Sequence, residues 1–297
     1  MLPGMLAKPL VAIVGAGNLG TALSASLKRS GYKIEFVLAR SRGASLKKAQ
    51  KLAKEVGAIA VALPSVPKEM LAQLIWFCVP DSDIVGAARA LAGQMTWAGR
   101  IALHSSGALA SDELSILRGK GAKVASVHPL MTFVRGSRPS LAGVSFALEG
   151  DAAAVRVAKR IVDDLGGHGY PIRKADKAAY HAWGTFASPL FTALLATTEQ
   201  VAGLAGVSAK ASRRRMIPIL LQTLANYASF DVGGAFSGPI VRGDVDTVRR
   251  HLQALRKLPA ARDVYSALAR AALHYLPVKN KKALRQTLGR KADLRAD

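Results

Sequence analysis

Candidate chemistry begins near the N-terminus, where six residues form a glycine-rich segment. Residues 15–20 read GAGNLG, which fits the pattern G-x-G-x-x-G, and they lie between an apolar run and a helical pattern. Here Gly15 permits a tight turn, Gly17 lets the backbone approach a pyrophosphate, and Gly20 lets helix and strand pack closely. The helix N-terminus then faces the phosphates. Rather than an ordinary turn, we predict a dinucleotide site with the residues Gly15, Gly17, Asn18, Leu19 and Gly20.

The residues after the second predicted strand indicate which dinucleotide binds. A site for NAD carries Asp or Glu about 20 residues past the glycines, where the carboxylate accepts a hydrogen bond from the ribose 2′-hydroxyl. Residues 38–42 instead read LARSR and hold no carboxylate. Arg40 and Arg42 offer charge-assisted hydrogen bonds to a 2′-phosphate, and Ser41 adds a hydroxyl donor. These residues predict NADP as the cofactor; the alternative is a pair of solvated arginines in a basic protein.

Three further strand ends carry polar groups, and ligands of open parallel sheets bind beyond the carboxyl ends of the strands. These ends read VPD at 79–81, HSSG at 104–107 and HPLMTF at 128–133. We predict cofactor contacts at Val79, Pro80, His104 and Ser105. We predict substrate contacts at Ser106 and His128.

Each of these strand ends also has a structural interpretation. Asp81 suits the N-cap of a following helix, which we favour over a role in binding. His104 and the serines after it are alternatively a satisfied loop histidine with a serine turn. His128 precedes a proline, which imposes an extended conformation and either aims the ring inward or merely shapes the loop.

The long helix predicted over Asp176–Ala205 presents a face of small and polar residues. At 100° per residue this narrow face comprises Lys177, His181, Gly184 and Ser188. A core-facing sector should be apolar, so this one faces solvent or the cleft between two domains. Pro189 should free a carbonyl near Thr185 and bend the helix there. We predict that Lys177 or His181 is the catalytic acid or base, the other orients the substrate, and Ser188 contacts it.

A parallel sheet must position these residues, and the alternation of strand-like and helical patterns along the chain predicts one. Up to about Gly150, short β-rich runs alternate with helical patterns, as βαβ units require. The predicted strands are Leu10–Val14, Ile34–Leu38, Leu74–Val79, Ile101–Leu103, Val124–Val127 and Val144–Leu148. After a turn and strand at Gly166–Ile172 the pattern is helical, with further helices at Ser208–Phe230, Asp244–Arg256 and Pro259–Tyr275. We predict an α/β domain at residues 1–172 and an all-α domain at residues 173–297.

Composition and charge narrow the class of protein. The 297 residues are 50% hydrophobic, which excludes a disordered or fibrous chain. The formal net charge is +23, but the excess is spread over both halves and only 6% of residues are aromatic, so we expect no specific nucleic-acid partner. The single cysteine, Cys78, lies in an apolar run and indicates a reducing compartment. Finding neither a signal peptide nor an apolar run of membrane length, we expect a cytoplasmic protein.

Six motifs together resemble an uncharacterised bacterial family. They are GAGNLG, FCVPDSDI, HSSG, HPLMTF, the helix with YHAW and FASP, and GPIVRGD. The family, numbered 2520 among domains of unknown function, couples a Rossmann-like domain to a helical C-terminal domain, and the resemblance covers nearly the whole chain. More distantly, the layout is similar to pyrroline-5-carboxylate reductases and β-hydroxyacid dehydrogenases, which have a 6-phosphogluconate-dehydrogenase-like helical domain. The resemblance implies a Rossmann fold and an oxidoreductase activity.

The resemblance also assigns residues. Lys177 lies where β-hydroxyacid dehydrogenases have a catalytic lysine followed four residues later by asparagine; here that later residue is His181, which can also bond a substrate oxygen. Many members of family 2520 read Ser-Asn where this chain has Ser188-Pro189, so a possible amide contact is lost. In GPIVRGD, Asp244 suits a helix N-cap, and Arg242 either anchors an acidic substrate group or pairs with a neighbouring carboxylate.

Together these features predict an NADP-dependent oxidoreductase. It would transfer hydride between nicotinamide and a small carbonyl, imine or hydroxy substrate held in the cleft between domains. No metal site is indicated. The alternative is a non-catalytic protein that binds or senses NADP or serves as a scaffold. Because such a helical domain carries more apolar surface than one Rossmann domain covers, we expect a homodimer formed mainly by residues after Asp176.

Overall fold

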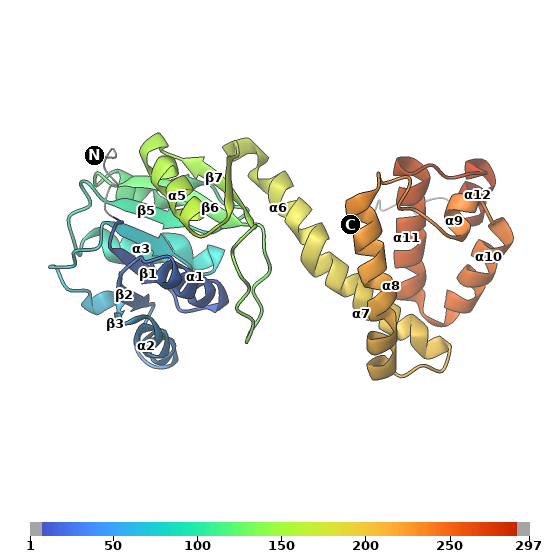
Figure 1. Ribbon diagram of the computed structural model, residues 1–297, viewed down its shortest axis with the longest axis horizontal. Helices are drawn as coiled ribbons and strands as arrows, with labels where there is room; N and C mark the ends of the chain where they lie inside the picture. The colour runs from blue at the N-terminus through green and yellow to red at the C-terminus, as the bar shows by residue number, and fades with distance from the viewer. Residues whose placement is uncertain (1–7, 290–297) are drawn as a thin grey trace, which may run out of the picture. The chain divides into compact units, whose positions relative to one another are not determined.

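The computed structural model describes residues 8–289, and the chain forms two compact units (Figure 1). The first unit spans Met1–Ala187 and the second spans Ser188–Asp297. A sheet with helices on both faces makes up the first unit, and the second unit is helical. The predicted fold class, a parallel-sheet α/β domain followed by a helical region, is therefore confirmed.

An eight-stranded sheet forms the centre of the first unit. Its strands are β1 (Val11–Val14), β2 (Ile34–Ala39), β3 (Ile59–Ala62), β4 (Leu74–Phe77), β5 (Ile101–His104), β6 (Lys123–Pro129), β7 (Ser145–Gly150) and β8 (His168–Pro171). Their order is β3-β2-β1-β4-β5-β6-β7-β8. Only the pairing of β6 with β7 is antiparallel among these strands. The strand order reverses direction at β1 and β4, which is where open sheets of this kind bind ligands.

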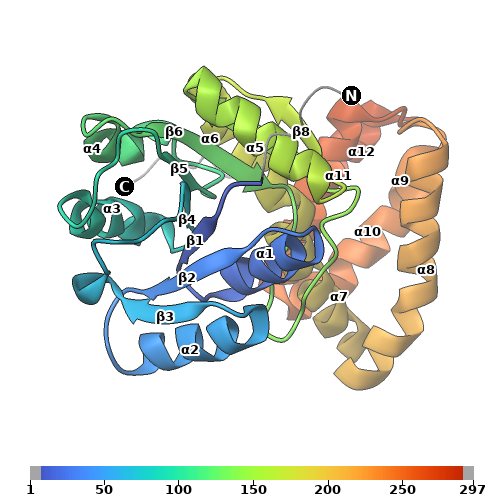
Figure 2. The ribbon, with the colours of Figure 1, turned by 60° about the vertical axis from the view of Figure 1, so that its left-hand side comes forward.

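Helices cover both faces of the sheet, as its apolar strands require (Figure 2). The first face carries α1 (Asn18–Arg29), α2 (Ala44–Val56) and α5 (Ala152–Asp164), and the second carries α3 (Ile84–Ala92) and α4 (Ser115–Arg118). Leu23, Leu52 and Ile161 belong to the first core cluster. Leu91 and Leu117 belong to the second. Short 3-10 turns lie at Leu63–Ser65, Asp81–Asp83, Ser111–Leu114, Lys174–Asp176 and Leu255–Lys257.

The sheet differs from the prediction at two places. Strand β3 was not predicted, because Ile59–Ala62 is a short run at the edge of the sheet, with Ile59 exposed. Strand β7 runs antiparallel to β6 because the connection at residues 130–144 contains no helix, and a parallel pair needs a longer crossover. Strand β8 lies within the predicted Gly166–Ile172 segment.

Helices continue from the sheet into the second unit. They are α6 (Lys177–Thr185), a π-helical segment (Phe186–Leu190), α7 (Phe191–Leu204), α8 (Ala209–Ser229), α9 (Pro239–Arg242), α10 (Val245–Ala254), α11 (Pro259–Tyr275) and α12 (Lys281–Thr287). Val248, Leu252, Leu273 and Leu284 pack in the core of the second unit. The predicted cap forms, because the Asp244 side chain accepts a hydrogen bond from the Thr247 amide at 3.0 Å.

The single long helix predicted over residues 176–205 does not form. Pro189 has no amide hydrogen to donate toward Thr185, and the helical ladder widens into the π-helical segment at this point. The two compact units divide inside the same segment, after Ala187. The division of the two domains after residue 172 stays a prediction. Helix α6, which follows residue 172, packs with the sheet in the first unit.

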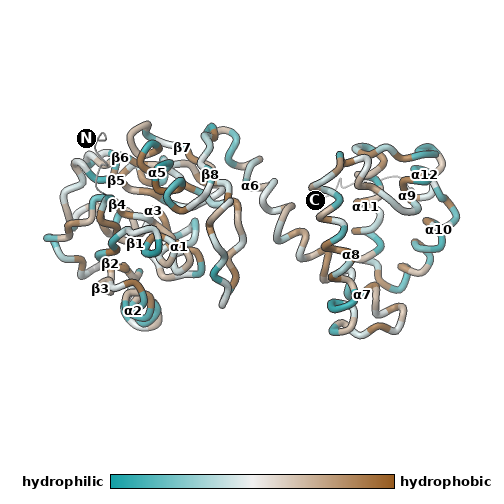
Figure 3. Tube along the Cα trace, viewed as in Figure 1, coloured by the Kyte–Doolittle hydropathy of each residue, from teal (hydrophilic) through white to brown (hydrophobic). Residues whose placement is uncertain are grey.

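Hydropathy varies strongly among the helices of the second unit (Figure 3). Helices α10 and α12 are rich in charged residues, whereas α7 is mainly apolar. Among residues 8–289, no single helix has both the length and the apolar composition needed to cross a membrane. Lys174–Leu204 and Ala209–Ser229 meet that requirement only as a pair, with a bend of 117° between them.

Candidate active site

The glycine turn after β1 has the geometry that its sequence predicts. Gly15 has a φ of +104°, and a Cβ there would lie 2.7 Å from the Cys78 carbonyl oxygen. A Cβ on Gly20 would collide with the Gly15 carbonyl oxygen, so this contact between turn and helix also requires glycine. Gly17 caps α1 and has nothing within 4 Å of the position of a Cβ. The start of α1 therefore has open space beside its backbone, as an approaching phosphate needs.

The predicted cofactor residues around this turn lie in different surroundings. The Asn18 side-chain amide donates to the Phe133 carbonyl oxygen at 3.1 Å, so it is engaged by the β6–β7 connection. Leu19 is half-buried against the core. Val79 lies against the turn, since a Cβ on Gly15 would approach its Cγ1 to 2.9 Å. Pro80 is exposed before the 3-10 turn.

The three polar residues after β2 are exposed. Arg40 forms an ion pair with Asp83 at 2.8 Å, which brings the end of β2 beside the turn after β4. Ser41 and Arg42 form no hydrogen bond or ion pair with the described residues. Arg42 can thus bind an anion without giving up an existing contact, whereas the Arg40 guanidinium would bind an anion while also paired with Asp83.

Strand register brings the ends of β1, β4, β5 and β6 together. Val14 pairs with Phe77, Phe77 with His104, and His104 with Ser126. Strand β6 continues past Ser126, so His128 lies two residues farther along on the same face. Side chains from the HSSG and HPLMTF motifs consequently meet at one edge of the sheet.

The HSSG loop is held by hydrogen bonds of its own side chains. His104 is fully buried; its Nδ1 accepts from the Ser106 amide at 3.1 Å, and its Nε2 lies 2.9 Å from the Ala110 carbonyl oxygen. Burial lowers the pKa of His104 to about 4, so the ring is neutral at pH 7. The Ser105 hydroxyl accepts from Trp76 Nε1 at 2.8 Å. These contacts match the alternative of a satisfied loop histidine rather than a free binding group.

Ser106 serves as the anchor of this loop. Its hydroxyl donates to Asp81 at 2.7 Å and accepts from the Leu109 amide at 2.9 Å. Asp81 therefore holds the loop and forms no N-cap hydrogen bond, which corrects the predicted capping role. The Ser106 hydroxyl thus both donates and accepts a hydrogen bond within the protein. The Ser106 carbonyl oxygen faces α6.

Lys177 is buried at the start of α6, with 1% of its surface exposed. Its ammonium group donates to the Ser126 hydroxyl at 2.7 Å and to the Ser106 carbonyl oxygen at 3.1 Å. Burial lowers the pKa of Lys177 to about 8, although the charges of Glu149 and Asp81 oppose that shift. Lys177 thus connects α6 to the HSSG loop and to β6, and its surroundings compensate its charge only in part.

One helical turn later, α6 contributes a second cluster. The Tyr180 hydroxyl lies 2.7 Å from His128 Nδ1, and the His128 and His181 rings meet edge to face at 6.2 Å between centroids. A Cβ on Gly107 would lie 2.7 Å from His181 Cδ2 and 2.9 Å from His128 Nε2. Only a glycine at this position leaves room for both imidazoles. Burial and the positive charge of Lys177 lower the pKa of His128 to about 4.

The remaining predicted residues lie in the second unit. Ser188 is half-buried within the π-helical segment, where the constant 100° spacing behind its predicted alignment with Lys177 no longer applies. Arg242 is exposed at the end of α9 and forms no ion pair with the described residues. Among the residues the structure describes, no cluster of three or more His, Cys, Asp or Glu side chains could hold a metal ion.

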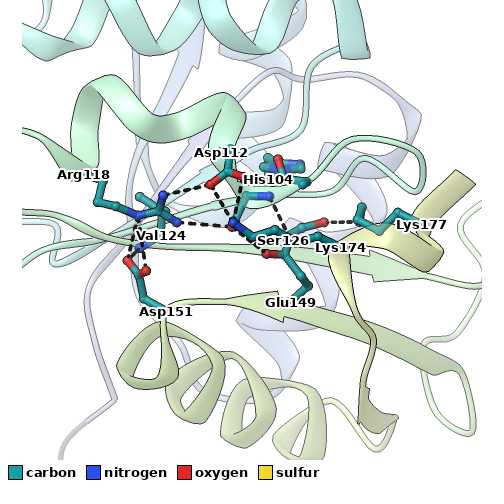
Figure 4. A network of polar contacts seen from close by, with 11 residues as sticks. His104, Asp112, Arg118, Val124, Ser126, Glu149, Asp151, Lys174 and Lys177 are labelled. Atoms are coloured by element: carbon teal, nitrogen blue, oxygen red, sulfur yellow. Dashed lines mark hydrogen bonds and ion pairs between the residues drawn. The ribbon is translucent and has the colours of Figure 1, made fainter.

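A polar network behind Lys177 was not anticipated (Figure 4). Glu149 is opposite Ser126 across the β6–β7 pair, and its carboxylate accepts from the Ser111 amide and hydroxyl, both at 2.8 Å. Lys174 extends the network to Asp112 at 2.7 Å. Tyr180, Ser126, Glu149 and Gly107 were all missed as site residues. Their roles depend on contacts between distant segments, and only the polarity of Ser126 and Glu149 within strand-like runs hinted at them.

Comparisons with known proteins agree with this architecture. Residues 5–129 match the model of a Rossmann-like domain, and residues 144–272 match the domain of unknown function DUF2520. No curated protein matches the sequence.

Three solved structures show the same fold at low identity. A Bacteroides fragilis protein provisionally described as an NADP oxidoreductase has a TM-score of 0.74 and 20% identity, covering 89% of this chain and 97% of its own. Thermotoga maritima protein TM1727 has a TM-score of 0.68 and 24% identity, covering 94% and 98%. A reductive aminase from Aspergillus terreus, in complex with NADPH and ethyl-5-oxohexanoate, has a TM-score of 0.63 and 17% identity, covering 94% and 99%.

The buried ammonium group gives a pH-dependent prediction for stability. The pKa of Lys177 is about 8 in the folded chain and near 10.5 when solvated, so the unfolded chain binds more protons between these values. Burial of the charge is therefore unfavourable below pH 8, and the penalty fades by pH 10.5. We expect the stability of Lys177→Met relative to wild type, measured by thermal denaturation, to be higher at pH 7 than at pH 10, because the wild type bears the burial penalty only where the ammonium is charged.

The control for this measurement is Lys54→Met, at an exposed position on α2. Its melting temperature should differ from wild type by the same small amount at both pH values. A difference for Lys177→Met that does not change with pH would show that the ammonium is not penalised by burial.

Proposed function

From the premise that this chain joins a Rossmann-like domain to a DUF2520 domain, we propose that it is an NADP-dependent oxidoreductase acting on a small carbonyl, imine or hydroxy compound. One observation carries the proposal. The open glycine turn after β1 lies at the same sheet edge as the His128, Lys177 and His181 cluster, and all of them belong to the first compact unit. The cofactor and the proton-transfer groups would thus share one rigid frame.

The residues present fit a dinucleotide. The Gly15–Gly20 turn and the start of α1 would hold the pyrophosphate, and Arg42 with Arg40 would meet a 2′-phosphate. Val79 and Pro80 would border the cofactor at the end of β4. When bound, the nicotinamide would supply or accept the hydride. The reductive aminase of the same fold is in complex with NADPH, which supports this choice.

We assign the proton transfer to His181 and a positioning role to Lys177. The His181 side chain is exposed beside Gly107 and can reach a small ligand at the sheet edge, whereas the Lys177 ammonium is buried and already donates two hydrogen bonds. His181 would give a proton to the substrate nitrogen or oxygen as hydride adds to carbon, or take it in the reverse direction. Lys177 would keep the HSSG loop and β6 in place. His128 and the Ser106 loop would border the substrate, and Ser188 and Arg242 remain proposed contacts from the helical unit.

The choice of cofactor can be tested by affinity. We expect NADPH to bind at least tenfold more tightly than NADH, about 1.4 kcal/mol, because Arg40 and Arg42 replace the acidic residue of an NAD site. Calorimetric titration of both dinucleotides measures the ratio. Alanine at both arginines should remove the preference; equal affinities in the wild type would contradict the assignment.

Turnover separates an enzyme from a binding protein. We expect His181→Ala to lower NADPH-dependent reduction of a panel of cyclic imines, and of ketones with amines, by about a hundredfold, with NADPH affinity unchanged. His168→Ala, at an exposed histidine on β8, is the matched control and should keep full activity. If His181→Ala retains wild-type turnover, the assignment of His181 fails. Tight NADPH binding without turnover of any panel member would favour the non-catalytic alternative.

We also propose that the protein is a homodimer formed through the helical unit. Helix α8 and the residue after it expose a set of large apolar side chains: Ile217, Ile219, Leu221, Leu224, Tyr227 and Phe230. An isolated chain would leave this much apolar surface in water, and closed two-fold assembly would cover it. Light scattering at micromolar concentration should give twice the mass of 31.2 kDa, and Ile219→Glu with Leu221→Glu should give the monomer. A wild-type monomer would refute the dimer.

Residence in the cytoplasm is a further proposal. Cys78, the single cysteine, lies buried at the end of β4, where burial raises the pKa of the thiol and keeps it unreactive. A chain with one buried thiol and no disulfide needs no oxidising compartment.

A further inference from the structure

The connection between β6 and β7, residues 130–144, reaches from the sheet edge past α1 and is here called the strap (Figure 1). It is fastened at two points. Its Phe133 carbonyl oxygen accepts the Asn18 side-chain amide at 3.1 Å, and its Arg138 pairs with Glu55 of α2 at 2.8 Å. One fastening therefore lies at the first residue of α1, directly beside the glycine turn.

A cavity of about 580 Å³ lies between these two fastenings. The glycine turn and α1 form one wall, α2 forms the second, and the strap forms the third. Its lining residues are Ala16, Gly17, Asn18, Thr21, Lys48, Lys51, Leu52, Glu55, Arg135, Gly136, Ser137 and Arg138. The cavity is thus continuous with the open face of Gly17.

The charges on the cavity wall are unequal. Four cationic side chains line it against one carboxylate, and that carboxylate, Glu55, is paired with Arg138. Lys48, Lys51 and Arg135 have no carboxylate partner among the described residues. Three cations without counter-charges at close range favour an anion between them, and a guanidinium with two ammonium groups suits phosphate oxygens.

We propose that Lys48, Lys51 and Arg135 form a phosphate subsite of the dinucleotide site, completed by the strap. The inference rests on the proposed function for the identity of the ligand. Because Arg40 is engaged by Asp83, Arg135 would provide a guanidinium on the opposite side of the phosphates from the end of β2. The Asn18 side chain would then act indirectly, by holding the strap over the cavity rather than by contacting the ligand.

The rival explanation is that these are ordinary solvated charges on a protein with a net charge of +23. Helix α2 offers a matched control for it. Lys54 is exposed on the same helix and does not line the cavity, so Lys54→Gln removes the same charge outside the proposed subsite. Arg135→Gln and Lys51→Gln remove one charge each inside it. All three side chains are exposed, so the variants should melt at the wild-type temperature.

Calorimetric titrations of the full chain with NADPH, NADH and inorganic pyrophosphate test the subsite. Arg135→Gln and Lys51→Gln should each weaken NADPH binding about tenfold, with Lys54→Gln within twofold of wild type. An equal loss for NADH would place the pyrophosphate in the subsite, and a loss confined to NADPH would place the 2′-phosphate there. Either result supports the proposal. NADPH affinities for Arg135→Gln and Lys51→Gln that match the Lys54→Gln control would overturn it, even if the wild type binds NADPH well.

The pyrophosphate titration separates this inference from the proposed function. If the wild type binds neither dinucleotide, the proposed function fails. A loss of pyrophosphate affinity specific to Arg135→Gln and Lys51→Gln would then still establish a phosphate subsite. No such loss would overturn the subsite as well.

Discussion

A single buried ammonium group holds the candidate site together. Lys177 connects α6 to the HSSG loop through the Ser106 carbonyl oxygen and to β6 through the Ser126 hydroxyl. A buried charge is tolerated only when hydrogen bonds and opposite charges compensate it, and here two oxygens and the nearby Glu149 carboxylate do so in part. This contact joins the start of α6 to the sheet, and Tyr180 and His181 lie one helical turn farther along.

The spacing of helix and strand explains why the cluster continues beyond Lys177. One turn of α6 separates Lys177 from Tyr180 and His181, and two residues of β6 separate Ser126 from His128. A helical turn rises 5.4 Å and a two-residue strand step spans about 6.6 Å. Because these two lengths are similar, Lys177 can contact Ser126 while Tyr180 and His181 contact His128. Gly107 lies where the two imidazoles converge, and the absence of a side chain there keeps the edge of the sheet accessible.

Local patterns predicted the parts of the site that depend on local geometry. The turn at Gly15, Gly17 and Gly20 is defined by steric requirements within six residues, so its motif indicated both its conformation and its position. A disturbance of the helix at Pro189 was predicted for the same reason, because a missing amide hydrogen acts on the adjacent turn; it was predicted as a bend, and the structure has a π-helical segment there.

Local sequence patterns did not predict the contacts between distant segments of the chain. The sequence left His104 open between a binding group and a satisfied loop histidine, and only the folded loop shows its ring bonded to Ser106 and Ala110. Helical periodicity placed Lys177 on a polar face, but could not show that Lys177 meets Ser126 and is buried while His181 on the same face is exposed. The strap carries no periodic pattern at all, and its reach to Asn18 and Glu55 depends on the antiparallel pairing of β6 with β7.

We propose that one sheet edge holds both a dinucleotide and the groups that move protons. A crystal structure of the full chain with NADPH tests it most directly. We expect the pyrophosphate beside Gly17 and the start of α1, and the nicotinamide ring on the side of Gly107 and His181. A cofactor bound elsewhere, or no cofactor at saturating concentration in crystals that leave the glycine turn open, would contradict it.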